Sequence, residues 1–266
     1  MEKSLTYKGT IIKYDVEGDG APVVLVHGFA EDRTVWHKQV PALKRYARLI
    51  VPDLPGSGRS AMLPIQGASM NDYAECLKAL LDAEQVHKCI MLGHSMGGYI
   101  TLAFAEMYPE VLAAFGFVQS TAYADSEEKK ASRKKGIEAI GNYGAYAFIK
   151  NTTPNLFAAA FKENHATEMD ALVEKGKGFK NEALQQYYTA MMNRPDRTHV
   201  LKSSKLPVLF IIGTEDIAAP IADVLPQTHM ADVAYISIIE NVGHMAMWEA
   251  ADEVNQKLAA FIEDVF

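Results

Sequence analysis

The sequence predicts an α/β protein with a mostly parallel sheet of eight strands, helices on both faces of the sheet, and an inserted helical cap. Three observations predict this class. Short continuous apolar runs, typical of strands buried on both faces, recur along the chain. Helical patterns separate most of these runs, as expected where crossovers join parallel strands. One long segment, residues 121–201, contains helical patterns and no convincing strand.

The individual elements follow in order along the chain. Residues 5–20 alternate apolar and polar side chains around Lys8-Gly9, which predicts a β-hairpin. Six apolar runs then predict buried strands: "PVVLVHG" (22–28), "RLIVPDLPG" (48–56), "KCIMLGHS" (88–95), "AAFGFVQS" (113–120), "LPVLFIIGTED" (206–216) and "VAYISIIENVGH" (233–244). Four periodic segments predict core helices: "WHKQVPALKRY" (36–46), "MNDYAECLKALLDAE" (70–84), "GGYITLAFAEMYPE" (97–110) and the final "AADEVNQKLAAFIEDVF" (250–266).

The length of 266 residues suits one large α/β core with an inserted subdomain, and 49% apolar residues supply a sizeable core. We expect the core to comprise residues 1–120 and 202–266, and the cap to comprise residues 121–201. Aromatic and methionine-rich helical segments such as "GNYGAYAFIK", "NLFAAAFKEN" and "NEALQQYYTAMMN" fill the cap. No internal repeat or flexible linker interrupts this organisation.

The charge and composition exclude several classes of partner. A formal charge of −7 opposes nucleic-acid binding, which needs clustered Lys and Arg. The one basic cluster, "EEKKASRKK" (127–135), opens with two acids and indicates the solvated face of a helix; the alternative is a membrane-surface or anion patch. No run approaches the roughly 18 apolar residues of a membrane span, and no signal peptide pattern begins the chain, so we expect a cytoplasmic protein. Cys76 and Cys89 are expected to be reduced core thiols.

A serine lies at the junction of a predicted strand and a predicted helix, in "MLGHSMGGYI" (91–100). A tight strand-to-helix turn forces its central residue towards positive φ, which is costly for a residue other than glycine. The turn also brings neighbouring positions close to the backbone, which explains Gly93, Gly97 and Gly98. This G-x-S-x-G pattern predicts a nucleophile elbow that presents the hydroxyl of Ser95. The alternative is a glycine-rich turn whose serine only caps the helix.

A serine nucleophile needs a base to remove its proton and a carboxylate to orient that base. The elbow predicts both downstream, first the acid and then the histidine, each after a strand. Asp216 ends the strand "LFIIGTED", and His244 follows the next strand in a loop that leads into a helix. Glu215 is an alternative acid, and so is Asp125, which follows the strand after the elbow helix. We expect Asp216 to be the acid.

Acyl transfer also needs two hydrogen-bond donors for the oxyanion. The backbone N–H of Met96, directly after the nucleophile, is the first expected donor. The second is the N–H of Phe29, in the "HGF" loop after the first buried parallel strand, where Gly28 lets the chain turn and the Phe29 ring would form a wall of the pocket. The alternative interpretation of "HGF" is a simple strand-exit turn.

The sequence offers no site for a cofactor or a metal. "DLPGSGRS" (53–60) lacks the third glycine of a dinucleotide fingerprint and the acidic residue expected at the end of a following strand, so it predicts a structural turn. No H-E-x-x-H, P-loop or cysteine cluster is present. The chemistry of serine, histidine and aspartate needs neither a metal nor a cofactor.

These motifs together resemble the α/β-hydrolase fold superfamily, specifically its small, capped, esterase-like serine hydrolases. The likeness covers nearly the whole chain: "HGFAEDRTVWHKQVPAL", "VPDLPGSGRS", "GHSMGGYI", "LPVLFIIGTEDIAAP" and "ENVGHMAMWEAADEVNQKLAAF". The serine at position 95 argues against the epoxide hydrolases and haloalkane dehalogenases of this fold, which use an aspartate nucleophile. The "HGFAED" loop lacks the "GGPG" of proline iminopeptidases and the "HGGG" of many lipases.

The resemblance implies an esterase-like serine hydrolase, and the Tyr, Phe and Met content of the cap indicates small to medium apolar esters as its substrates. Two rivals remain open. One uses the same serine, histidine and aspartate but cleaves a carbon–carbon bond or eliminates pyruvate. Such enzymes need basic residues to bind the carboxylates of their substrates, and Arg33, Arg59 and Arg194 are the candidates. The other is a non-catalytic ligand-binding receptor on the same fold.

Overall fold

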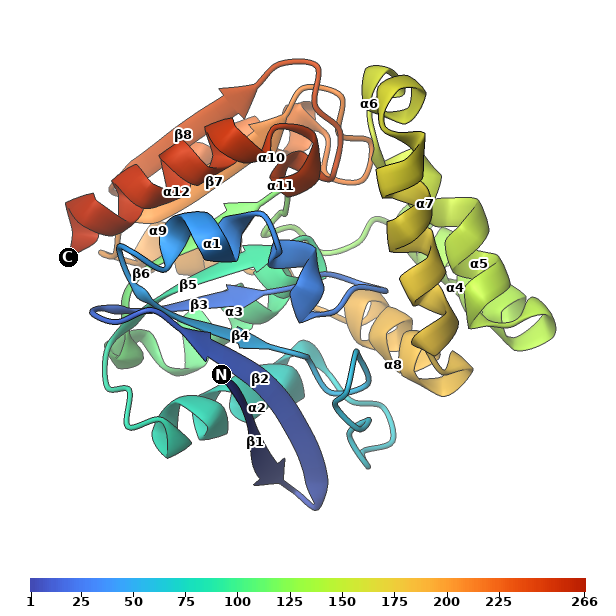
Figure 1. Cartoon of the computed structure of the whole chain (residues 1–266), viewed down its shortest axis with the longest axis horizontal. Coiled ribbons are helices and arrows are strands. Elements are labelled where there is room, and N and C mark those ends of the chain that lie inside the picture. Colours follow the sequence, from blue (N-terminus) through green and yellow to red (C-terminus); the bar gives the residue numbers. More distant parts are fainter.

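The computed structural model describes all 266 residues, and its strands form one sheet in the order β1-β2-β4-β3-β5-β6-β7-β8 (Figure 1). β2 pairs antiparallel with β1 and with β4, and every other neighbouring pair is parallel. The predicted mostly parallel, eight-stranded sheet is confirmed. Its strands are β1 (Glu2–Tyr7), β2 (Thr10–Glu17), β3 (Pro22–Val26), β4 (Arg48–Pro52), β5 (Cys89–His94), β6 (Leu112–Val118), β7 (Val208–Gly213) and β8 (Ala234–Ile239).

The predicted amino-terminal hairpin is confirmed. Tyr7 pairs with Thr10 across a two-residue turn, and both turn residues have positive φ, 46° at Lys8 and 75° at Gly9. Such a turn matches the right-handed twist of the two flanking strands.

Side chains of the central strands alternate between two hydrophobic clusters, one on each face of the sheet. In β3, Val24 and Val26 join one cluster, and Val23 and Leu25 join the other. Helices α2 (Met70–Ala83) and α3 (Met96–Met107) cover the first face, and α1 (Gln39–Leu43) and α12 (Ala251–Val265) cover the second (Figure 1). The remaining core helices are η1 (Arg33–Trp36), η2 (Pro109–Val111), α10 (Ile221–Thr228) and α11 (Ala246–Glu249).

The helix expected over residues 36–46 is wrong in its extent. The structure has the short 3₁₀ turn η1 and then a five-residue α1. Asp32 caps η1 by accepting a hydrogen bond from the Thr34 N–H. Pro41 has no N–H to donate to the carbonyl of His37, which the first turn of α1 tolerates but a helix continuing from Trp36 would not.

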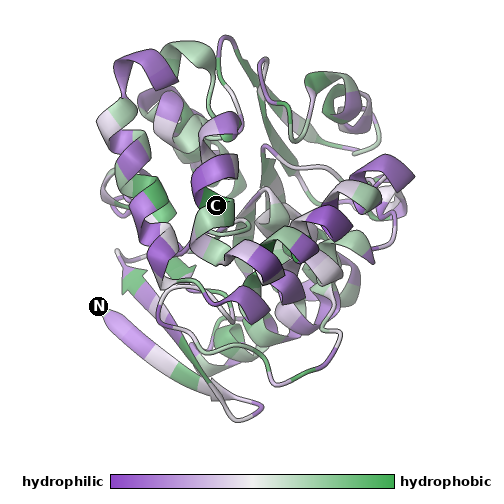
Figure 2. Ribbon diagram, turned by 90° about the vertical axis from the view of Figure 1, so that its right-hand side faces the viewer, coloured by the Kyte–Doolittle hydropathy of each residue, from purple (hydrophilic) through white to green (hydrophobic).

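Between β6 and β7 the regular elements are all helices, as predicted. It contains α4 (Glu127–Tyr143), α5 (Ala145–Thr152), η3 (Thr153–Leu156), α6 (Ala159–Asn164), α7 (Ala166–Lys175), η4 (Gly176–Gly178), α8 (Asn181–Met192) and α9 (Thr198–Ser203). Figure 1 shows α4 to α8 gathered at one end of the sheet, and we refer to these helices as the cap. Figure 2 views that side, where hydrophilic and hydrophobic residues alternate along the helices, as expected for amphipathic elements.

Two predicted cap helices are interrupted, and one predicted solvated face turns partly inward. Gly144, with φ of 89°, separates α4 from α5, and an extended stretch at Phe157–Ala158 separates η3 from α6. The basic cluster lies on α4 as expected, but Arg133 is mostly buried and pairs with Asp125. Arg133 can be buried because the buried carboxylate of Asp125 neutralises its charge.

Both cysteines are buried and unpaired, as predicted. No helix combines the length and apolar character needed to cross a bilayer.

Candidate active site

Ser95 occupies a strained turn between β5 and α3. Its φ of 49° and ψ of −117° lie in a region that favours glycine. A Cβ on Gly93 would lie 2.3 Å from the backbone of Gly97, and a Cβ on Gly97 would lie 2.3 Å from the carbonyl oxygen of Val26. Only glycine fits at either position, so the turn has the tight geometry that the sequence pattern predicts.

Asp216 and His244 meet at the ends of neighbouring strands. Asp216 follows β7 and His244 follows β8, and His244 Nδ1 lies 2.8 Å from Asp216 Oδ2. The other carboxylate oxygen of Asp216 accepts the N–H groups of Ala218 and Ala219, at 2.8 and 2.9 Å. Because the carboxylate can only accept, Nδ1 carries a proton and Nε2 is left as the basic nitrogen of the neutral ring.

The environment of this pair shifts the two pKa values in opposite directions, each toward the charged form of the side chain. Burial alone would lower the pKa of His244, but the charge and hydrogen bond of Asp216, with smaller contributions from Glu31 and Glu249, raise it. Burial alone would raise the pKa of Asp216, but His244 and the two N–H donors lower it. Asp216 is thus held ionised beside an imidazole that binds a proton more readily than a free one.

The loops that carry these two residues are fixed to each other. The N–H of Asn241 donates to Thr214 Oγ1 at 2.9 Å, and the N–H of Glu215 donates to the carbonyl of Val242 at 2.9 Å. A Cβ on Gly213 would lie 2.5 Å from the carbonyl oxygens of Val242 and Gly243. This close approach needs glycine, and it holds Asp216 in register with His244.

Ser95 is connected to the loop of His244 by the residue that precedes it, His94. The His94 and His244 rings lie 4.9 Å apart between centroids, and His94 Nε2 contacts the His244 carbonyl oxygen at 2.9 Å. Ser95 itself is partly exposed, and no hydrogen bond joins its hydroxyl to the His244 ring in this structure. Catalytic hydrogen bonds of this kind often tighten only when substrate is bound.

The loop of residues 27–32, which carries the expected donor Phe29 and which we therefore call the oxyanion loop, packs directly against the elbow. A Cβ on Gly28 would lie 3.2 Å from Ser95 Cβ. The Leu54 N–H donates to His27 Nε2, so the proton of His27 is on Nδ1, which donates to the Gly28 carbonyl at 2.8 Å. The N–H groups of Phe29 and Met96 take part in no loop or side-chain hydrogen bond, and the Met96 N–H begins α3, where the first N–H groups have no partner within the helix.

The ring of Phe29 joins this loop to the cap. It stacks on Tyr188 of α8 with centroids 4.1 Å apart and planes within 2° of parallel, and it meets Phe148 and Tyr187 edge-on at 6.4 Å. An aromatic wall therefore lies between the oxyanion loop and the cap helices.

Glu249 is a residue of the site that sequence reasoning missed. Its carboxylate accepts the N–H groups of Gly243 and Met245, on either side of His244, and the N–H of Ala158 in the cap. The His244 N–H donates to the carbonyl of Leu156 at 2.7 Å. The only sequence signal is one carboxylate within the apolar stretch "MAMWEA".

Gln119 is a second missed residue. It has a φ of 48°, and its amide donates to the carbonyl of Gly243 at 3.0 Å. No sequence pattern marks it, because its partner is far along the chain.

Neither of the two alternative acids forms a hydrogen bond or ion pair with His244. Glu215 is exposed and makes no side-chain hydrogen bond. Asp125 is buried and pairs with Arg133 and with Arg194, whose guanidinium lies 2.8 Å from Asp125 Oδ1. Arg194 also lies over the ring of Tyr99 at 3.8 Å.

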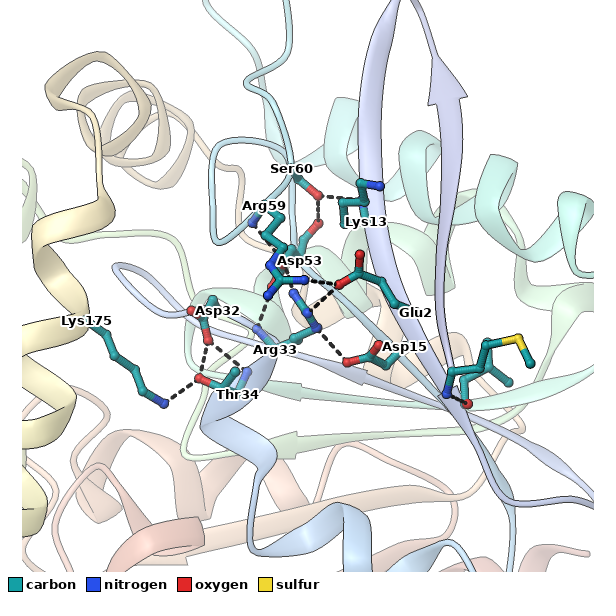
Figure 3. Close-up of polar contacts among 12 residues, drawn as sticks. Glu2, Lys13, Asp15, Asp32, Arg33, Thr34, Asp53, Arg59, Ser60 and Lys175 are labelled. Atoms are coloured by element: carbon teal, nitrogen blue, oxygen red, sulfur yellow. Dashed lines mark hydrogen bonds and ion pairs between the residues drawn. The ribbon is translucent and has the colours of Figure 1, made fainter.

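The other two candidate arginines are engaged in a network near the amino-terminal hairpin (Figure 3). Arg33 pairs with Asp15, Asp53 and Glu2, and Arg59 pairs with Glu2. In the same view Lys175 of α7 reaches across from the cap to donate to Thr34 Oγ1 at 2.6 Å. All three candidate arginines thus already have carboxylate partners.

The segment "DLPGSGRS" forms a turn closed by Asp53, which accepts the N–H groups of Arg33 and Arg59 at 2.9 and 3.0 Å. A Cβ on Gly58, whose φ is 53°, would lie 2.4 Å from the Asp53 carboxylate. The segment therefore has the structural role that was expected.

No group of three or more His, Cys, Asp or Glu side chains is arranged to hold a metal. A cavity of about 370 Å³ between residues 62–67 and α8 is lined by none of the candidate site residues. We assign this cavity no part in the chemistry.

Comparisons with known proteins bear on the fold and the family of this chain. The sequence profile of the alpha/beta hydrolase fold family matches residues 21–135. The dihydrolipoyllysine-residue acetyltransferase component of the acetoin cleaving system of Pseudomonas putida is 31% identical over 94% of this chain. The chain spans 65% of that relative's length.

Two further relatives match over nearly their whole length. The 2-hydroxy-6-oxononadienedioate/2-hydroxy-6-oxononatrienedioate hydrolase of Burkholderia vietnamiensis is 26% identical, with 94% of this chain and 90% of that protein covered. The solved structure of a thermophilic esterase from Thermogutta terrifontis superposes with a TM-score of 0.93 at 28% identity, covering 100% of this chain and 99% of that one. The chain belongs to the alpha/beta hydrolase fold superfamily.

Proposed function

We propose that this protein is a serine esterase that hydrolyses small to medium apolar carboxylic esters through an acyl-enzyme. Ser95 is the nucleophile, His244 the general base, and Asp216 the acid that orients His244. The observation that carries the proposal is the 2.8 Å contact between His244 Nδ1 and Asp216, formed beside a serine in a strained turn. A buried carboxylate–histidine pair next to such a serine is the arrangement that activates a hydroxyl.

Acylation begins with proton transfer from Ser95 Oγ to Nε2 of His244, as Oγ attacks the acyl carbon of the ester. The carbonyl oxygen of the ester takes up negative charge and accepts hydrogen bonds from the N–H groups of Phe29 and Met96. His244 then gives its proton to the departing alcohol oxygen, the carbon–oxygen bond breaks, and the acyl group remains on Ser95.

Deacylation repeats these steps with water. His244 Nε2 takes a proton from water as the water oxygen attacks the acyl carbon. The same imidazole returns that proton to Ser95 Oγ, which releases the carboxylic acid. Asp216 stays ionised throughout and stabilises the imidazolium, in keeping with its lowered pKa.

An apolar substrate is favoured over a dicarboxylate. The wall beside the oxyanion loop is aromatic, formed by Phe29, Phe148 and Tyr188. The Burkholderia vietnamiensis relative is named for a dienedioate, which carries two carboxylates. The arginines that could bind such groups here already pair with carboxylates of the chain. One methylene in an apolar pocket is worth about 1–3 kcal/mol of discrimination, so we expect broad tolerance of acyl length.

A chain-length series of p-nitrophenyl esters tests the proposal, with a dicarboxylate carbon–carbon substrate run in parallel. We expect saturable hydrolysis of the esters, none by Ser95→Ala, and full activity in Ser203→Ala, which removes an exposed hydroxyl on α9. Faster turnover of the dicarboxylate would favour the carbon–carbon hydrolase. Absence of turnover and of an acylation burst with every substrate would favour the non-catalytic receptor.

A further inference from the structure

His94 is a fully buried histidine that the proposed reaction does not use. It precedes Ser95 and lies between two loops of the site. Its Nδ1 lies 3.0 Å from Glu31 Oε2, and its Nε2 lies 2.9 Å from the carbonyl oxygen of His244. The ring therefore spans from the oxyanion loop to the loop that carries the proposed base.

Both of these contacts are to acceptors. A backbone carbonyl can only accept a hydrogen bond, and an ionised carboxylate can only accept as well. A neutral imidazole has one donor nitrogen and one acceptor nitrogen, so it cannot satisfy both partners. With an ionised Glu31, His94 must be an imidazolium that donates from both nitrogens.

Glu31 is placed to be that ionised partner. It is only 6% exposed, and the residue before it, Ala30, has a φ of 57°, which turns the chain at this point. Oε2 of Glu31 also accepts the Gly28 N–H at 2.7 Å. Burial alone would raise the pKa of Glu31, but His94 and the Gly28 N–H outweigh it and lower that pKa.

Gly28 shows how closely these groups are packed. A Cβ at this position would lie 2.9 Å from His94 Nδ1 and 3.0 Å from Glu31 Oε2, as well as close to Ser95. The hydrogen bond from Gly28 to Glu31 therefore closes the oxyanion loop on itself, and the contact of Glu31 with His94 holds that loop against the elbow.

We propose that Glu31 and His94 form a buried ion pair that positions the Phe29 N–H and the His244 ring around Ser95. This inference rests on the proposed esterase function. Glu31 holds the oxyanion loop through the Gly28 N–H, and His94 holds the His244 loop through its carbonyl. Both are positioning residues, because neither contacts the reacting atoms.

The charge of Glu31 also has a consequence for the reaction. When His244 accepts the proton of Ser95 it becomes positive, and the His94 ring lies only 4.9 Å away. A positive His94 by itself would oppose that step, since like charges this close in a buried site repel strongly. The carboxylate of Glu31 neutralises His94 and removes the opposition.

Steady-state kinetics of Glu31→Gln, His94→Asn and the double variant test the coupling. We expect kcat for a p-nitrophenyl ester to fall at least tenfold in each single variant, with KM within about twofold of the original protein. Because the two residues act as one unit, the double variant should lose no more than the worse single variant. Additive losses, or a kcat within twofold of the original in Glu31→Gln, would overturn the proposal.

Glu84→Gln is the matched control. Glu84 is also a buried carboxylate, with a side chain 5% exposed, and it bonds Tyr14, Lys3 and Arg48 but no residue of the site. We expect its removal to lower the melting temperature while kcat stays within twofold. If Glu84→Gln lowered kcat as much as Glu31→Gln, the effect would be general destabilisation and the proposal would fail.

Nitrogen-15 NMR of labelled histidine measures the protonation of the His94 ring directly and does not depend on activity. Because it uses the unsubstituted protein, it is informative even if a variant does not fold. Backbone-linked correlations in the unsubstituted protein assign the His94 ring, and we expect both of its nitrogens to be protonated at pH 7.5. A neutral His94 ring would overturn the ion pair while leaving the esterase proposal intact. Failure of the unsubstituted protein to hydrolyse any ester would sink the esterase proposal, and with it the positioning role.

Discussion

At the scale of single residues, the strain at Ser95 distinguishes the proposed nucleophile from a serine that only caps a helix. A serine that only capped a helix would have extended backbone, whereas Ser95 has a φ of 49°. Strain of this kind persists where the surrounding structure holds it in place. Here the glycines at 93 and 97 and the packing of β5 against β3 and β6 do so.

This strain gives a prediction about stability that is separate from activity. Ser95→Gly and Ser95→Ala should both abolish ester hydrolysis, but only glycine relieves the strain. Allowing for the greater flexibility of glycine in the unfolded chain, we expect Ser95→Gly to have the larger free energy of unfolding by about 1 kcal/mol. Urea denaturation of the two variants measures the difference, and equal stabilities would show that the turn is unstrained.

The pair of His244 and Asp216 predicts a pH dependence. As the proposed base, His244 can accept a proton only when neutral, and Asp216 raises its pKa above the ordinary value of 6.5. The midpoint of the acidic limb of the kcat/KM profile should therefore lie above pH 6.5, and it should move to lower pH in Asp216→Asn. That variant should also lose about 10³–10⁴-fold in kcat, because the imidazole loses its orientation.

The pH–rate profile of both proteins checks this, with Asp196→Asn as the control. Asp196 is an exposed aspartate that bonds only Thr198. An acidic limb that stays in place when Asp216 is replaced would show that another group titrates.

At the scale of elements, the cap segment between η3 and α6 is fastened to the His244 loop. A Cβ on Gly243 would lie 2.7 Å from both the Leu156 carbonyl oxygen and the Ala158 nitrogen. We expect Gly243→Ala to push this segment away, lower the melting temperature and reduce kcat at least tenfold.

Gly178→Ala is the matched control for that change, because a Cβ there meets nothing within 4 Å. Thermal melts and ester kinetics of the two variants should differ clearly. Similar behaviour of both would mean that the cap does not constrain His244.

The entry to the cap is fixed by a second cluster, in which Asp125 pairs with Arg133 of α4 and with Arg194 beyond α8. Asp125→Asn leaves two mostly buried guanidinium groups without their anion. Removing one partner of a buried pair costs about 3–5 kcal/mol, and we expect a loss of that order in the free energy of unfolding.

Kinetics of Asp125→Asn separate this role from that of the catalytic acid. We expect KM to rise as the cap loosens, while kcat at saturating substrate changes by less than threefold. A loss of kcat as large as that of Asp216→Asn would instead identify Asp125 as the acid.

At the scale of the whole molecule, the sequence predicted what depends on local patterns. The buried strands are continuous apolar runs, and the turn at Ser95 needs its glycines within three residues, so both could be recognised from short stretches. The order of Asp216 and His244 after successive strands is the order that the nucleophile-elbow pattern implies.

What the sequence did not predict depends on contacts between distant segments. Glu31 meets His94 across 63 positions, and Glu249 meets Ala158 across 91. Arg133 belongs to a basic segment with every local sign of solvation, yet a buried carboxylate draws it inward. Such roles exist only once the chain has folded, so no local pattern marks them.

The central claim is that His244, held by a distant part of the chain, makes the Ser95 hydroxyl nucleophilic. Reaction with a fluorophosphonate, followed by intact mass and peptide mapping, tests it most directly. We predict that one equivalent attaches at Ser95, and that His244→Gln slows the attachment at least a hundredfold. Absence of modification, modification at another residue, or a rate indifferent to position 244 would contradict the account.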